Sequence, residues 1–248
     1  AWCEELAGAM GLEVSLKAGE SQTITVILGY FEKEKEAARL IRKVLPAAYR
    51  AKAQAKLEKR NQNLIAGSTV KTPNEQLNRL INVWGKHQMQ LCVEFGRDGA
   101  RGFRDTLQDA WGTATTNQPL ARAKILETLA HQWEDGHAVR GWLPLQKHHY
   151  SDGPTWIAPT VSAYIKETGE TAFLDAKAPY LDQGEDTVLG HLLKGVRWLS
   201  DDTGAHGLVL AHEGDWNDSL NWMGRGGKGE SVWTSMALFY SLRITADL

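Results

Sequence analysis

The sequence predicts a mainly α-helical protein, in which short strands and a helical linker precede a barrel of paired helices. From residue 72 onward, apolar residues recur at helical spacing in one segment after another, and short turns alternate with long polar loops. Before residue 31, two segments instead alternate apolar with polar residues, which is typical of strands with one buried face. Because loops on such a scaffold commonly carry function, we expect the site to lie on them.

The predicted strands cover residues 13–18 and 21–30, and Gly19 and Glu20 form the turn between them. A single pair of strands is only marginally stable in water. We therefore expect this pair to belong to a larger sheet whose other strands lie upstream.

The linker is predicted as two helices. Residues 32–45 change to helical spacing, Pro46 ends that helix, and residues 47–66 form a charged, Ala-rich second helix. The shift in composition between residues 31 and 70 marks the domain boundary. It divides the chain into residues 1–31, 32–71 and 72–248.

The helical domain is predicted to start at Thr72, as the N-cap, with Pro73 in the first helical position. Apolar residues then fall at helical spacing as far as Leu91. The spacing predicts five further helices, at 104–112, 118–133, 156–168, 186–200 and 230–246. Long polar connections at 134–155 and 201–229 separate some of them.

Composition excludes several classes of function. The net charge is −2, from 28 basic and 30 acidic residues without a long run of one sign, so nothing favours nucleic acid or an anionic membrane as partner. No apolar run approaches the roughly 20 residues of a membrane helix. The two cysteines, Cys3 and Cys92, are too few for a disulfide framework and favour a reducing, cytoplasmic location. The chain starts without Met and ends within a predicted helix, so we expect an internal piece of a longer protein.

The most informative motif is the stretch 213–221, in which Glu213, Asp215 and Asp218 surround Trp216 and Asn217. Carboxylates can transfer protons and accept hydrogen bonds from hydroxyl groups, amides can donate and accept, and an indole covers the apolar face of a pyranose. These residue types indicate a sugar site. A solvated polar turn with one buried Trp is the alternative, and the ten Trp residues of the chain could equally fill a core.

A second motif, at 96–109, holds Arg97, Arg101, Arg104 and Asp105 among glycines. Arginine offers fixed donors for sugar hydroxyls or phosphate, and a carboxylate can bind two neighbouring hydroxyls. Surface salt bridges at a helix start are the simpler interpretation. The segment lacks the Gly-Lys-Ser/Thr ending of a P-loop, which argues against nucleotide binding.

A third motif, at 143–156, contains the neighbours His148 and His149 and then Asp152. Adjacent histidines point apart on regular structure, and no third ligand stands nearby in the sequence. We therefore expect no metal site, and interpret the segment as a polar loop at the rim of a pocket.

Together these motifs resemble family 94 glycoside phosphorylases, a family that includes cellobiose, cellodextrin, laminaribiose and chitobiose phosphorylases and domains of cyclic β-1,2-glucan synthases. The resemblance rests on four motifs in the order of the family, which cover most of residues 70–248: Gly102–Asp109, Trp156 with Ala163–Gly169, Gly214–Asp218 and Gly229–Trp233. It implies that residues 72–248 are the first part of an (α/α)6 barrel. It also implies that residues 13–45 hold the last strands of a β-sandwich and the start of a helical linker.

The resemblance further implies an inverting reaction in which inorganic phosphate, the co-substrate, cleaves a β-linked gluco-oligosaccharide to an α-sugar 1-phosphate, with no cofactor. A hydrolase needs an acid and a base, but phosphate is already an anionic nucleophile, so one acid suffices. By similarity that acid is Asp218. Trp216 is expected to pack on the donor sugar, and Arg104 and Asp105 to shape the same subsite.

The resemblance leaves other roles open. Either Arg97 or Arg101 is expected to hold phosphate, with Arg97 favoured. The family has two consecutive Asp where this chain reads Ser151-Asp152-Gly153, so only Asp152 carries over. Glu213, Asp215 and Asn217 are placed near substrate by their motif, in roles that could be structural.

The resemblance also implies that the remaining barrel helices follow Leu248, so we expect the 248 residues alone to be inactive. The full-length protein is expected to be a homodimer. Three other functions remain open: a phosphorylase-like module of a cyclic β-1,2-glucan synthase, a non-catalytic sugar-binding barrel, and an inverting hydrolase.

Overall fold

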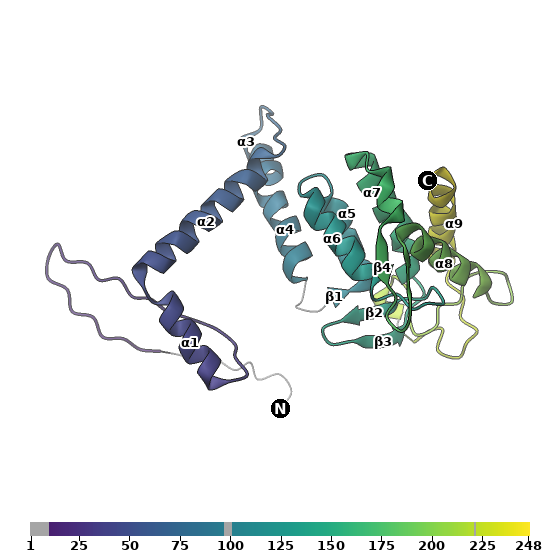
Figure 1. Cartoon of the computed structure of the whole chain (residues 1–248), viewed down its shortest axis with the longest axis horizontal. Coiled ribbons are helices and arrows are strands. Elements are labelled where there is room, and N and C mark those ends of the chain that lie inside the picture. Colours follow the sequence, from purple (N-terminus) through teal and green to yellow (C-terminus); the bar gives the residue numbers. More distant parts are fainter. Residues whose placement is uncertain (1–9, 97–100, 221) are drawn as a thin grey trace. The chain divides into compact units, whose positions relative to one another are not determined.

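The computed structural model describes residues 10–96, 101–220 and 222–248 of the chain. Most of the elements within these ranges are helices, and the strands are short (Figure 1). The chain divides into two compact units, Ala1–Lys59 and Arg60–Leu248. The boundaries predicted at residues 31 and 71 stay predictions.

The first unit contains an extended segment without strand pairing. The predicted turn is present, since Glu20 N donates to Lys17 O at 3.0 Å and Gly19 has a φ of 83°. The prediction of paired strands at 13–18 and 21–30 is nevertheless wrong for the described residues, where this segment is in no sheet. Its apolar residues remain at least partly exposed, and Leu28 is 99% exposed. Two unsupported strands cannot hold a ladder.

The predicted linker helices are confirmed as α1 (Glu34–Val44) and α2 (Ala47–Ala66). Helix α2 starts directly after Pro46, as expected for a residue that cannot continue a helix. No residue of α1 is buried, and Leu64 is the only buried residue of α2.

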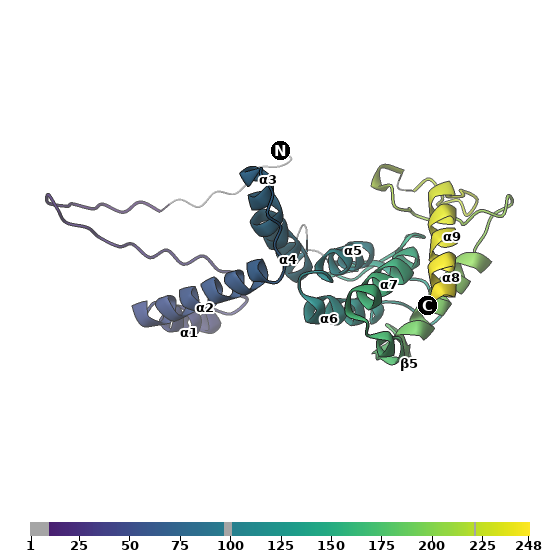
Figure 2. The same cartoon turned by 90° about the horizontal axis from the view of Figure 1, so that it is seen from above.

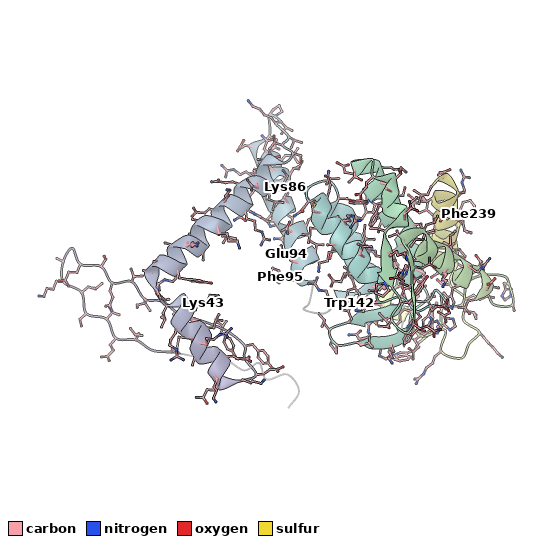
Figure 3. The ribbon with its side chains drawn as sticks, viewed as in Figure 1. Lys43, Lys86, Glu94, Phe95, Trp142 and Phe239 are labelled. Atoms are coloured by element: carbon pink, nitrogen blue, oxygen red, sulfur yellow. The ribbon has the colours of Figure 1, made fainter. Side chains whose placement is uncertain are left out.

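After the end of α2, the second unit continues with one helical rod made of α3 (Glu75–Arg79), a π-helical turn η1 (Leu80–Gly85) and α4 (Lys86–Phe95). Its predicted N-cap at Thr72 is wrong, because the Asn74 side chain accepts from Gln76 N and Leu77 N instead. Asn74 is closer to those amides in the sequence, so its short side chain can reach them. The carbonyl oxygen of Thr72 instead accepts from the side chain of Asn78. On α4, buried Lys86 donates to the carbonyl groups of Ile65 and Ser68 (Figure 3).

All five later helices are confirmed, with shifted ends. They are α5 (Phe103–Thr113), α6 (Gln118–Leu129), α7 (Ile157–Thr168), α8 (Val188–Asp201) and α9 (Val232–Asp247). Helix α6 ends before the predicted residue 133, because the chain turns there into a loop through bonds such as His131 N to Thr128 O.

These helices pack around one apolar core. Helix α5 contacts α4, α6 and α7, and α9 contacts α7 and α8 (Figures 1 and 2). Side chains at the centre of the core are 0–1% exposed: Leu107, Ile125, Leu129, Ile157, Val161, Leu192 and Leu199. Side-chain caps hold three helix starts, at Asn117, Thr187 and Ser231.

Two small antiparallel sheets lie within the predicted loops. The first has the order β1 (Arg101–Gly102), β2 (Val139–Trp142), β3 (Gln146–His149), and the second pairs β4 (Lys177–Pro179) with β5 (Glu185–Thr187). In Figure 1 the first sheet lies at the end of α5 where that helix begins. Trp142 marks the end of β2 in Figure 3. Strand β1 leads directly into α5, so this sheet positions the start of the helix.

A chain of mainly helical structure is thus confirmed, while closure into a barrel and the preceding β-sandwich stay predictions. Within the described ranges, every helix is too short or too polar to cross a bilayer.

Candidate active site

A cavity of about 450 Å³ lies between the start of α5 and the β2–β3 hairpin. Five residues that the sequence predicted for the site line this cavity: Arg101, Arg104, Asp105, Asp152 and Asp218. They come from three segments that are far apart in the sequence. The structure therefore brings together the start of α5 with Arg104 and Asp105, the loop before α7 that holds Asp152, and residues 213–220. We call residues 213–220 the acidic loop.

Arg104, in the first turn of α5, joins these segments. Its Nη1 donates to Asp152 Oδ2 at 3.1 Å and to Trp216 O at 3.0 Å, and its Nη2 lies 3.2 and 3.3 Å from the two carboxylate oxygens of Asp218. Burial acts to lower the pKa of Arg104, but the charges of Asp152, Asp218 and Asp105 outweigh it and raise that pKa. Arg104 is therefore a permanent cation that orients two carboxylates.

Asp152 lies in the wall of the cavity and is 2% exposed. Besides Arg104, its Oδ2 accepts from Trp156 Nε1 at 3.2 Å. Burial raises the pKa of Asp152, while the charge of Arg104 and the bond from Trp156 act against that rise. The carboxyl group is thus held in one orientation and shielded from water.

Asp218 starts the short 3-10 turn η4 (Asp218–Leu220) and is more open, with 58% of its side chain exposed. The neighbouring Asn217 shapes this turn, since its Oδ1 accepts from Ser219 N at 3.1 Å. Asn217 does not line the cavity, whereas Asp218 does.

Asp215 anchors the acidic loop. It is 4% exposed, and its two oxygens accept from Asn217 N at 2.8 Å and from Ser231 Oγ at 2.5 Å. Ser231 is also the N-cap of α9, because its Oγ accepts from Thr234 N at 3.0 Å. The predicted substrate-binding position of Asp215 is thus occupied by a carboxylate that ties the loop to a helix start, outside the cavity lining.

Trp216 belongs to a row of three indoles. Its ring stacks on Trp233 with the centroids 5.4 Å apart and 15° between the planes, and Trp233 stacks on Trp156 at 5.9 Å and 30°. Trp216 remains 47% exposed. Trp216, at one end of the row, is therefore open to a ligand. Trp156, at the other end, donates to Asp152.

Glu213 points to the β3 side of the loop. Its Oε2 accepts from His149 N at 2.9 Å and from His148 Nδ1 at 3.2 Å. The backbone bond from His149 is the main cause that lowers the pKa of Glu213. Glu213 does not line the cavity, so it holds the loop against the hairpin.

The ring of His149 lies between two other histidines. It stacks on His212 with the centroids 3.9 Å apart, and His137 lies 5.2 Å away. Burial and these neighbours lower the pKa of His149 to about 4. Over the residues with assigned positions, no three His, Cys, Asp or Glu side chains are arranged to hold a metal ion.

The two arginines expected at phosphate stand differently. Arg101 lines the cavity, yet its Nη1 donates to Val93 O at 3.0 Å and its Nη2 to Glu94 O, at the end of α4. Its guanidinium thus caps a helix end. Arg97 lies outside the described residues. Asp105 lines the cavity beside Gly102, where any side chain would clash with the carboxylate.

Three polar residues of the lining were not predicted as site residues: Arg140, Gln146 and Tyr150. Gln146 and Tyr150 lie within the segment 143–156 that was predicted to form the rim of a pocket. All three lie in or next to strands of four residues, too short for a clear alternation. Their place in the polar connection that leads to Asp152 was the only available signal.

Comparisons with known proteins identify the family to which this chain is similar. The family model described as "Glycosyl hydrolase 94 superfamily, catalytic domain" matches residues 61–248. A solabiose phosphorylase of Paenibacillus borealis is 49% identical over 99% of this chain and 32% of its own length. A 3-O-beta-D-glucopyranosyl-beta-D-glucuronide phosphorylase of Paenibacillus borealis is 30% identical over 97% and 32%, and an N,N'-diacetylchitobiose phosphorylase of Vibrio furnissii is 28% identical over 99% and 35%.

The chain therefore spans about a third of the length of these relatives. The family match covers all the cavity-lining residues, together with the loop and the helix start that support them. The chain belongs to the glycosyl hydrolase 94 superfamily.

Proposed function

We propose that the full-length protein is an inverting phosphorylase, which uses inorganic phosphate to cleave a β-linked gluco-oligosaccharide into an α-sugar 1-phosphate and a shortened acceptor. The three relatives compared above are named as phosphorylases of solabiose, of 3-O-beta-D-glucopyranosyl-beta-D-glucuronide and of N,N'-diacetylchitobiose. The observation that carries the proposal is the position of Asp218, a solvent-exposed carboxylate in a cavity that also holds Arg104 and Asp105.

A single acid fits this reaction. The leaving sugar oxygen needs a proton, which a carboxylic acid can supply. The nucleophile needs no base, because phosphate is already an anion, and a second open carboxylate facing it would repel it. Asp152, the fixed neighbour of Asp218, is buried and bonded to Arg104 and Trp156, which suits an orienting role better than proton transfer.

Arg104 connects the two carboxylates to the acid step. It donates to Asp152 through Nη1 and to Asp218 through Nη2. A general acid must carry a proton when the substrate binds. We infer that the incoming sugar draws the guanidinium fully onto Asp152, so that the Asp218 carboxylate takes up a proton from solvent. Asp218 then donates this proton to the leaving sugar oxygen as the glycosidic bond breaks.

We assign the remaining roles as part of the same proposal; Trp216 itself lies next to the cavity and does not line it. Trp216, with its open indole, packs on the donor sugar, and Asp105 accepts hydrogen bonds from neighbouring sugar hydroxyls beside Arg104. For phosphate we favour Arg97 over Arg101, because the guanidinium of Arg101 already donates to two carbonyl groups. Glu213, Asp215 and Asn217 support the loop that carries Asp218.

We also propose that the full-length protein works as a cytoplasmic homodimer without a cofactor, and that the 248 residues alone release no sugar phosphate. Helix α9 supports the second point, since Met236 and Phe239 on its outer face are 68% and 65% exposed (Figure 3). Light scattering of the full-length protein tests the dimer, and a phosphorolysis assay of the short chain tests its inactivity.

The activity is tested by incubating the full-length protein with cellobiose, laminaribiose, sophorose and chitobiose, with and without phosphate. We expect sugar 1-phosphate only when phosphate is present. Cleavage without phosphate would identify a hydrolase, and binding without cleavage would identify a non-catalytic barrel.

The acid assignment is tested by Asp218→Asn, which should lower kcat on unactivated disaccharides by about 10²–10⁴-fold. An aryl glucoside, whose leaving group needs no proton, should be affected far less. Asp175→Asn, at an exposed carboxylate of the turn η3 (Thr171–Asp175), serves as the matched control. A wild-type rate for Asp218→Asn on disaccharides would refute the assignment.

A further inference from the structure

The cavity contains a cation that the proposed reaction has not used. Arg140 lies on β2 and lines the cavity together with Arg104 and Asp218. It is the exposed member of its strand, whose other residues, Val139, Gly141 and Trp142, are buried. A charged side chain at this position points away from the core and is available to a ligand.

Arg140 differs from the other cations of the cavity in its partners. The guanidinium of Arg104 is shared between Asp152 and Asp218, and that of Arg101 donates to the carbonyl groups of Val93 and Glu94. Within residues 10–96, 101–220 and 222–248, Arg140 forms no ion pair with a carboxylate. Among the described residues its charge thus has no carboxylate partner, and the cavity that it lines gives a ligand access to it.

The contact that Arg140 does make holds it in place. Its guanidinium carbon lies 4.9 Å from the centre of the Tyr150 ring. A cation over an aromatic face is attracted by the ring but keeps its N–H donors for other acceptors. Arginine has five such donors in a fixed fork that matches carboxylate and phosphate oxygens.

Tyr150 in turn is a fixed platform. It is 7% exposed, and a side-chain carbon at Gly214 would come within 2.8 Å of its ring. The next residue, Ser151, donates from its backbone N to Gly214 O at 3.0 Å. The acidic loop thus supports the ring, and the ring supports Arg140, so the cation is positioned before a ligand arrives.

We propose that Arg140 is a specificity-determining residue, which binds an oxyanion of the substrates in this cavity. The oxyanion has two possible sources with the same chemistry: inorganic phosphate, or the carboxylate of an acidic acceptor sugar such as a uronate. The inference rests on the proposed function for its kinetic test, but its binding test is independent of turnover.

The kinetic test compares Arg140→Gln and Arg140→Lys with wild type in the full-length protein. We measure KM for phosphate in the cleavage direction, and kcat/KM for glucose and for glucuronate as acceptors in the synthesis direction. Loss of a charge-assisted hydrogen bond costs about tenfold or more in affinity. Arg140→Lys keeps the charge but loses the fork, so its effect should be intermediate.

The two sources give different results. If phosphate is the ligand, Arg140→Gln raises KM for phosphate about tenfold and leaves the ratio of kcat/KM for glucuronate to kcat/KM for glucose unchanged. If an acidic acceptor is the ligand, this ratio falls about tenfold and KM for phosphate stays constant. Either result supports the proposal.

Arg225→Gln is the matched control. Arg225, like Arg140, lies over an aromatic ring, at 4.5 Å from the centre of the Trp222 ring, but it does not line the cavity. Equal and small effects of Arg140→Gln, Arg140→Lys and Arg225→Gln on all three kinetic constants would overturn the proposal.

Calorimetric titration of the full-length protein with inorganic phosphate, and separately with glucuronate, removes the dependence on catalysis. The inference is supported if one of these two ligands binds more weakly to Arg140→Gln but not to Arg225→Gln. This holds even when the protein cleaves no disaccharide, and in that case only the proposed function fails. Cleavage by wild type combined with unchanged binding in Arg140→Gln would leave the function and refute the inference. A thermal melt confirms that each variant folds, and Arg140→Lys replaces Arg140→Gln if the latter does not.

Discussion

The two halves of the acidic loop differ in how they are held. In the first half, Asp215 is 4% exposed and bonded to Ser231, and Glu213 is bonded to the backbone of His149. In the second half, Asp218 has 58% of its side chain exposed and Trp216 is 47% exposed. Two aspartates of the same motif thus have different surroundings: Asp215 is tied to a helix start, and Asp218 is the open carboxylate that we propose as the acid. Burial and partners decide the role, and the residue type does not.

The largest change in stability should come from removing Arg104, which donates to the buried Asp152 and to the exposed Asp218. Arg104→Met leaves the buried carboxylate of Asp152 without its cation, which costs about 3 kcal/mol. Without that cation the pKa of Asp152 rises further above its unfolded value, so the folded state binds more protons. The loss should therefore be smaller at pH 5 than at pH 7. Urea titrations at both pH values measure it, and an equal loss at both would contradict the role of Asp152.

The next largest effect should come from the anchored half. Asp215→Ala removes two hydrogen bonds and leaves Ser231 Oγ buried without its acceptor, which costs about 2 kcal/mol of unfolding free energy. Chemical denaturation of the same protein measures the change. Ser231→Ala should lose a similar amount, and the double variant little more, because both substitutions break the same bond. Fully additive losses would speak against the coupling of loop and helix start.

A smaller effect should appear as a dependence on pH. The pKa of His149 is about 4 in the folded protein, below the ordinary histidine value of 6.5, so the unfolded chain binds more protons between these values. The unfolding free energy should therefore fall as the pH falls from 6.5 to 4. Allowing for partial solvent screening, this loss amounts to about 1–2 kcal/mol.

His149→Phe should flatten this dependence, because the ring can still stack on His212 but no longer titrates. Thermal melts between the two pH values measure the slope. A slope that survives in His149→Phe would assign the titration to another group, of which His137, His212, Asp135 and Asp202 are the neighbours.

The smallest change in stability should come from the open half. Asp218→Ala removes an exposed carboxylate whose ion pair with Arg104 is open to water, and should change the unfolding free energy by less than about 1 kcal/mol. Calorimetric melts of this variant and of Asp215→Ala, measured side by side, compare the two halves directly. A loss at Asp218 as large as that at Asp215 would remove the distinction between them.

The helices were predictable because each one shows its period within a single stretch of sequence. The cavity could be predicted in part for a different reason: Arg104, Asp152 and Asp218 each stand in a recognisable motif. Their contacts were not predictable, since Arg104 and Asp218 are 114 residues apart in the chain. The sequence did not indicate the short strands β2 and β3, because four residues are too few to show an alternation. For the same reason it did not single out Arg140 and Tyr150 as lining residues.

The errors have local causes. At the start of α3, Thr72 and Asn74 are both good N-caps, and the choice depends on where the helix axis begins. In the first unit, the alternating pattern of residues 13–30 predicted two paired strands, but pairing needs neighbours that the pattern itself does not supply.

The row of Trp216, Trp233 and Trp156 has an optical consequence. Indoles stacked at 5.4 and 5.9 Å couple their electronic transitions, so the row should produce a characteristic band in the near-ultraviolet circular dichroism spectrum. Since Trp216 belongs to the loop that carries Asp218, while Trp233 belongs to α9, the band depends on the distance between loop and helix. The difference spectrum between wild type and Trp216→Phe would isolate it, and would provide a built-in signal for movement of this loop during ligand binding.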